Sequence, residues 1–142
     1  MNLLRSLPLL LALSPAALAG GLYLEISQGA SGALLHAKVT ACHEPAKSVV
    51  TASIVTVVNG ELQRQPLQVA PIAHQAGVFA ISGALPAGNV IVELAVTNPQ
   101  FKNYQPRVLI RAEGSKLQLA TKKHFFSVPP QVADYRQVLL TD

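Results

Sequence analysis

Hydrophobic and polar residues alternate along several short stretches of the chain, and Gly and Pro separate these stretches. Leu22, Leu24 and Ile26 alternate with more polar neighbours, and residues 35–41 repeat the pattern. Because successive side chains of a strand point to opposite faces, this alternation predicts strands with one buried face. The predicted strands are residues 22–27, 35–41, 49–58, 61–69, 79–81, 90–97, 106–112 and 116–121.

Asn59-Gly60 separates two of these strands and predicts a two-residue hairpin, because a type I′ turn needs positive φ at both central positions. In such a hairpin Val58 faces Glu61, and continued pairing would bring Val50 opposite Val69. The apolar face would then switch along the hairpin, which indicates a bulge or a strong twist. Pro66 lacks a donor for a central ladder and predicts an edge strand.

The segment Gly77–Ala120 carries a further set of motifs. It contains Gly-x-Phe-x-apolar at 77–81, Leu-Pro-x-Gly at 85–88, an alternating strand, an aromatic-polar-Tyr connection at 101–104 and a last hairpin. In this order the motifs resemble the second half of transthyretin-like (prealbumin-like) modules, of which the carboxypeptidase regulatory-like domains are one branch. The resemblance implies an all-β, immunoglobulin-like or transthyretin-like sandwich of seven to eight antiparallel strands. It also implies a non-catalytic accessory or binding module, and it carries over no catalytic residues.

The C-terminal segment has a different period. After Pro129-Pro130, the residues Val132, Tyr135 and Leu139 fall at i, i+3 and i+7, which predicts a short amphipathic helix. We expect a β-sandwich domain over residues 20–128 and a tail over 129–142 that packs on it, covering an open sheet edge or end. The alternative is a segment that docks a partner.

Residues 1–19 have the three-part plan of a secretory signal peptide. Arg5 supplies the positive charge, a short apolar run follows, and Ala17-Leu18-Ala19 is an A-x-A cleavage site. The apolar run is shorter than the ~20 residues of a membrane span. We therefore expect cleavage near Ala19, a secreted or periplasmic location, and no transmembrane segment in the mature protein.

The charge of the mature chain is modest. About 123 residues remain after cleavage, with ten basic and seven acidic residues, so the net charge is +3. The basic residues are dispersed apart from Lys122-Lys123, and the chain has no tryptophan. A nucleic-acid surface requires clustered cations with aromatic platforms, so the composition argues against a nucleic-acid partner. No motif indicates a cofactor.

Cys42 is the only cysteine and is followed by His43, Glu44 and Pro45. One cysteine cannot form an intramolecular disulfide, and adjacent strand residues point to opposite faces, which argues against a Cys42–His43 catalytic pair. The preferred interpretation is a small apolar residue at a strand end. Two alternatives remain: a copper or zinc site using Cys42, His43 and Glu44, and a Cys42-linked dimer.

Together these patterns favour a non-catalytic binding or accessory β-sandwich protein with a protein partner in the cell envelope, as part of an envelope complex. The second hypothesis is a small metal-handling protein for copper or zinc centred on Cys42 and His43. The third is a cysteine-dependent enzyme, for which His36, His74 or His124 would have to supply the base.

Overall fold

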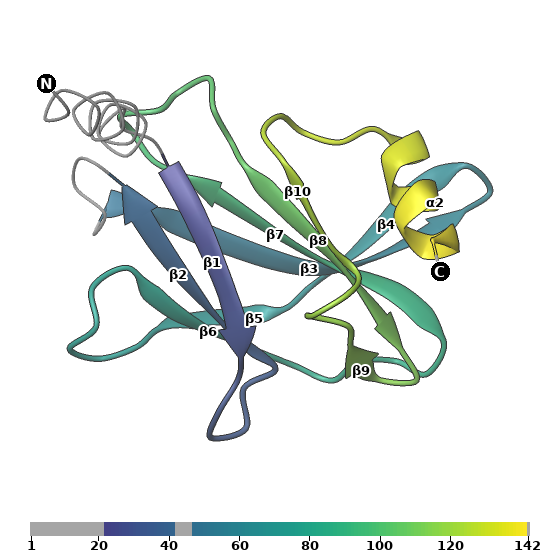
Figure 1. The fold of residues 1–142 in the computed structure, drawn as a ribbon, viewed down its shortest axis with the longest axis horizontal. Helices are drawn as coiled ribbons and strands as arrows, with labels where there is room; N and C mark the ends of the chain where they lie inside the picture. Colours follow the sequence, from purple (N-terminus) through teal and green to yellow (C-terminus); the bar gives the residue numbers. More distant parts are fainter. Residues whose placement is uncertain (1–21, 42–46, 142) are drawn as a thin grey trace, which may run out of the picture.

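The structure is a computed structural model that describes residues 22–41 and 47–141 (Figure 1). Within these ranges ten strands form two antiparallel sheets, and one short helix lies near the C-terminus. The all-β prediction with a C-terminal helix is confirmed, although the chain forms more strands than the seven or eight expected. The elements are β1 (Leu22–Gln28), β2 (Leu35–Ala41), β3 (Val49–Val58), β4 (Glu61–Pro66), β5 (Gln68–Pro71), β6 (Val78–Ser82), β7 (Asn89–Thr97), β8 (Arg107–Glu113), β9 (Lys116–Leu117), β10 (Lys123–Phe126) and α2 (Val132–Leu140).

The two sheets face one another across a hydrophobic core. The smaller sheet has the order β1-β2-β6-β5, and the larger has the order β10-β8-β7-β3-β4, with β9 paired to the end of β8. The alternation seen in the sequence places one row of apolar residues from each of β1, β2, β3, β6, β7 and β8 on the inner face. The buried core residues are Leu22, Leu24, Leu35, Ala37, Val39, Val50, Ala52, Ile81, Val92, Leu94, Val96, Val108 and Ile110.

The hairpin at Asn59-Gly60 forms as predicted, and then the chain changes sheet. The φ angles of Asn59 and Gly60 are 52° and 80°, and Val58 pairs with Glu61. The pairing continues only to Pro66, which lies opposite Ser53. As predicted, Pro66 is in an edge strand, because β4 is the outermost strand of the larger sheet. The predicted pairing of Val50 with Val69 is wrong, because β5 crosses to the smaller sheet and pairs with β6. The switch of apolar face seen in the sequence therefore marks a crossing between sheets.

The helix α2 covers the outer face of the larger sheet, where it contacts β3, β7 and β8 (Figure 1). The helix was expected at a sheet edge or end, and it lies on a face instead. The reason is that β7 and β8 are apolar on both faces, so the outer side chains of Val55, Ile91 and Leu109 also need cover. Among the described residues no helix has the length and apolar character needed to span a bilayer.

Candidate functional site

The residues proposed for a metal site, Cys42, His43 and Glu44, lie outside the described residues, as does the predicted signal peptide 1–19. The metal site and the Cys42-linked dimer therefore stay predictions. Within residues 22–41 and 47–141, no group of three or more His, Cys, Asp or Glu side chains could hold a metal ion.

The three histidines weighed as catalytic bases lie on separate elements. His36 is on β2, His124 is on β10, and His74 lies in the loop between β5 and β6. No two of them share a strand or a loop.

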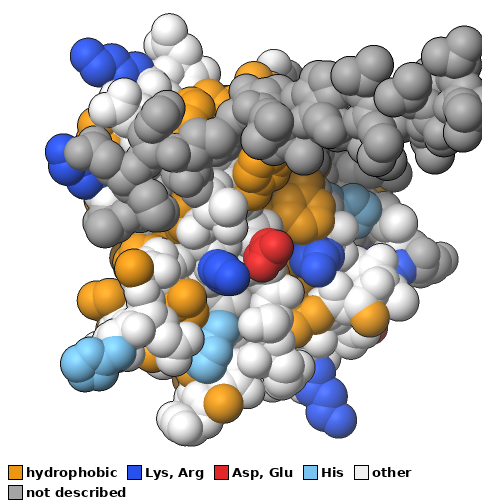
Figure 2. Space-filling view, turned by 60° about the vertical axis from the view of Figure 1, so that its left-hand side comes forward, with side chains coloured by type: hydrophobic (Ala, Val, Ile, Leu, Met, Phe, Trp, Pro, Cys, Tyr) orange, Lys and Arg blue, Asp and Glu red, His pale blue; other side chains and the backbone are white. Residues whose placement is uncertain are grey.

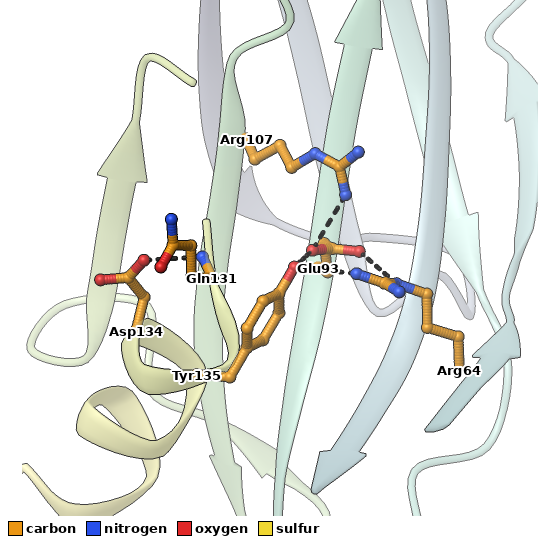
Figure 3. A network of polar contacts seen from close by, with 6 residues as sticks. All are labelled: Arg64, Glu93, Arg107, Gln131, Asp134 and Tyr135. Atoms are coloured by element: carbon orange, nitrogen blue, oxygen red, sulfur yellow. Dashed lines mark hydrogen bonds and ion pairs between the residues drawn. The ribbon is translucent and has the colours of Figure 1, made fainter. Parts of the chain in front are cut away.

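A buried ion network lies beneath α2, on the outer face of the larger sheet (Figure 3). At its centre is Glu93 of β7, which is only 4% exposed. Arg64 of β4 donates from Nε to the Glu93 carboxylate over 2.9 Å, and Arg107 of β8 lies 3.2 Å from its other oxygen. The hydroxyl of Tyr135, on α2, also donates to this carboxylate. Three strands and the helix are thus joined at one buried carboxylate.

The network sets the protonation of its members. Burial alone would raise the pKa of Glu93, but the hydrogen bonds from Arg64 and Tyr135, with the charges of both arginines, outweigh it and lower the pKa. Burial and the hydrogen bond to Glu93 raise the pKa of Tyr135 to about 12. Glu93 is therefore ionised and Tyr135 neutral near neutral pH. A carboxyl group with a lowered pKa and a hydroxyl with a raised pKa are poor proton-transfer catalysts near neutral pH. The pKa directions therefore favour a structural role for the network.

A second set of polar contacts holds the far end of α2. Arg111 of β8 donates to the backbone carbonyls of Leu139 and Thr141, and Lys122 donates to the Thr141 carbonyl over 3.0 Å. Cations at a helix C-terminus satisfy its unpaired carbonyls and complement the helix dipole. At the other end, the Asp134 carboxylate accepts a hydrogen bond from the Gln131 backbone N–H over 2.7 Å. Contacts of Tyr135 and of the C-terminal end therefore fix the helix to the sheet, and the Asp134 contact caps its first turn.

A cleft of about 510 Å³ opens on the opposite side of the sandwich from the β4–β5 crossing. It lies between β1, at the edge of the smaller sheet, and β10, at the edge of the larger sheet. Its volume is within the range of small-molecule and peptide-side-chain sites. The lining residues are Leu22, Tyr23, Leu24, Glu25, Tyr104, Pro106, Arg107, Val108, Phe125, Phe126 and Ser127.

Two exposed aromatic residues line this cleft. Phe125 lies opposite Val108 on the inner face of the larger sheet, yet it is 60% exposed. Tyr23 on β1 is 55% exposed. An inner-face aromatic ring normally contributes to the core, so the exposure of Phe125 shows that the described chain leaves this part of the sandwich uncovered.

The cleft is bordered by charge of both signs. The ammonium group of Lys123 lies 5.7 Å from the centre of the Phe125 ring. Glu25 borders the cleft and pairs in register with Lys38 of β2. Figure 2 shows the molecule from the side of the smaller sheet, with an acidic side chain between two basic ones and hydrophobic side chains beside them. Arg107 shares the single carboxylate of Glu93 with Arg64, so this pair of cations keeps one positive charge in excess.

Neither feature was predicted from the sequence. Glu93 was placed only within the predicted strand 90–97, and no role was assigned to it. The signal that could have identified it is its neighbour Ile91 on the same face, because two apolar faces indicate a strand covered on both sides. Nothing in the periodicity of residues 123–126 indicated a strand, and the cleft depends on the position of that strand.

The described chain is a two-sheet antiparallel β protein, consistent with a β-sandwich, with one short C-terminal helix. Comparison with family models, with curated proteins and with solved structures returned no match.

Proposed function

We propose that this protein is a secreted or periplasmic, non-catalytic binding or accessory module with a protein partner in the cell envelope, and that the cleft between β1 and β10 is its binding surface. The observation that carries the proposal is the cleft itself. It is lined mainly by apolar residues, two of them exposed aromatic residues, and it lies between two sheet edges that have no further strand in the described chain.

Two further observations support the proposal. The signal-peptide pattern at 1–19 supports a location outside the cytoplasm. The resemblance of Gly77–Ala120 to transthyretin-like and carboxypeptidase regulatory-like modules supports an accessory role. That segment forms β6 to β9.

The test is photo-cross-linking in cells that make the protein. A photoreactive amino acid replaces Tyr23 or Phe125 in the cleft, or Val58 or Leu140 at exposed apolar positions elsewhere. We expect one discrete adduct from the two cleft positions and none from the two controls. The adduct should form with protein that has lost about 19 residues, the length of a signal peptide.

Two results would contradict the proposal. The first is equal cross-linking from all four positions, which would mean that the cleft is not the binding surface. The second is recovery of the uncleaved chain in the cytoplasm, which would remove the proposed location.

A further inference from the structure

We propose that the cleft binds an extended peptide segment of the partner, and that this segment adds to the smaller sheet as a strand next to β1. This inference rests on the proposed function, since it specifies how the cleft would bind a protein. It follows from the direction of the main-chain groups along β1 and β10 and from the uncovered ring of Phe125.

The cleft runs along the edge of a strand, not across its face. It is lined by four consecutive residues of β1, Leu22 to Glu25, and by three consecutive residues at β10, Phe125 to Ser127. Neighbouring side chains in a strand point to opposite faces, so a cavity on one face would touch only every second residue. Contact with consecutive residues places the cavity beside the backbone itself, where an edge strand presents N–H and C=O groups.

The register shows which groups of β1 point into the cleft. The Val39 N–H donates to Gly77, so the main-chain groups of Val39 point from β2 towards β6. In an antiparallel ladder, Leu24 opposite Val39 is then a non-hydrogen-bonded partner whose N–H and C=O point away from β2. Leu22, two residues earlier, has the same orientation. Both residues border the cleft, so β1 offers two donors and two acceptors there.

The same reasoning applies to β10. The Arg111 N–H donates to the Lys122 carbonyl, so hydrogen-bonded pairs recur at every second residue from there. Phe125 falls between these pairs, and its main-chain groups point away from β8 into the cleft. However, β10 is only four residues long and Pro129-Pro130 follow soon after, and proline has no N–H. The seven-residue β1 is therefore the better template, with Phe125 as the side-chain anchor.

The cleft also constrains the side chains of the bound segment. Alternate residues of an added strand would point inward, over Phe125 and beside Leu22 and Leu24, so they should be apolar. Lys123 lies two residues from Phe125 on the same face of β10, so it favours an acidic residue at one of the inward positions. Lys123 makes no ion pair within the described ranges, so its charge is available to such a residue. The occupant is therefore a segment of alternating apolar residues that carries a carboxylate.

The probe is a short capped peptide in which valine alternates with threonine and one inward-facing valine is replaced by glutamate. Its matched control is the same peptide methylated at two backbone nitrogens on the side that would face β1. Methylation removes the donors and keeps every side chain. A third peptide has lysine in place of glutamate. Binding to the mature protein is measured by calorimetry, and amide exchange of Leu22 and Leu24 is followed by NMR.

We expect the unmodified peptide to bind and to slow amide exchange at Leu22 and Leu24. The methylated peptide should bind about tenfold more weakly or worse, since two main-chain hydrogen bonds are lost. The lysine peptide should also bind more weakly. Phe125→Ala should weaken binding, whereas Leu140→Ala, at an exposed position on α2, should leave it unchanged. The far-UV circular dichroism of both variants confirms that they are folded.

Four results would overturn the inference. Equal binding of the methylated and unmodified peptides would mean that only side chains are recognised. Binding of a fatty acid but of no peptide would mean an acyl occupant, and dimerisation without peptide binding would mean a second copy of this chain. If no peptide, fatty acid or second copy binds, strand addition is wrong. In each of these cases the cross-linking experiment still decides separately whether the protein has a partner at the cleft.

Discussion

Replacing Tyr135 by phenylalanine should destabilise the protein by about 1.5–3 kcal/mol, the range for a hydrogen bond to a charged group. The ring is fully buried against Val55, Ile91 and Leu109, and phenylalanine keeps this packing. The change removes only the hydroxyl, which donates to Glu93 and accepts a hydrogen bond from Arg64 over 3.0 Å. The effect therefore measures the polar part of the attachment of α2.

The assay is urea unfolding followed by far-UV circular dichroism, because the chain has no tryptophan to serve as a fluorescent reporter. The matched control is Tyr23→Phe, at a ring that is exposed. It should change the unfolding free energy by less than about 0.5 kcal/mol, as surface substitutions usually do.

The pH dependence gives an independent check with a defined sign. The pKa of Tyr135 is raised from 10.0 to about 12, so the folded state holds this proton more tightly than the unfolded state. The resulting stability is fully present below pH 10 and is lost as the pH rises towards 12. At about 1.4 kcal/mol per unit, the loss from this group is at most about 3 kcal/mol. Tyr135→Phe should lack it. A variant as stable as the wild type, with the same alkaline profile, would refute the role given to the hydroxyl.

Three further outcomes are expected. Gly60 has a φ of 80°, so Gly60→Val should lower the unfolding free energy by about 1–2 kcal/mol, and an unchanged urea midpoint would contradict this. The lowered pKa of Glu93 means that its stabilisation is present above its ordinary pKa of 4.5 and lost as the pH falls through the folded value. Thermal unfolding of Glu93→Gln should therefore depend less on acid pH than that of the wild type, and parallel curves would refute the ion network. Cys42→Ser and His43→Ala should bind Cu(I) and Zn(II) no more weakly than the wild type, and tight stoichiometric binding lost in both variants would instead establish the metal-handling hypothesis.

Local patterns predicted the strands better than their partners. The alternation of Leu22, Leu24 and Ile26 is a property of one strand, and the turn at Asn59-Gly60 depends only on its own backbone angles. Which sheet a strand joins is decided by distant residues. Val69 was expected opposite Val50, but it pairs with Ile81 in the other sheet. The alternation of a strand is the same whichever sheet covers its apolar face, so the pattern carried no information on this choice.

The least predictable parts were those that form the candidate site. The segment 116–121 was predicted as a strand, but only Lys116–Leu117 is one, and β10 follows at Lys123–Phe126. The strand β10 has a weak pattern because none of its four residues is fully buried on either face. Glu93 resembles any polar residue in a strand until α2 is placed over it. The periodicity of Val132, Tyr135 and Leu139 predicted that helix correctly, but not the face on which it lies.

The position of α2 after the ten described strands affects the order in which the protein can fold. Tyr135 follows Glu93 by 42 residues and Arg64 by 71, so their contacts close long loops and cannot form before α2 has been synthesised. Until then Val55, Ile91 and Leu109 form an open apolar surface around a charged carboxylate. A nascent chain therefore passes through a stage in which this surface is accessible to chaperones and proteases, and docking of the helix ends that stage.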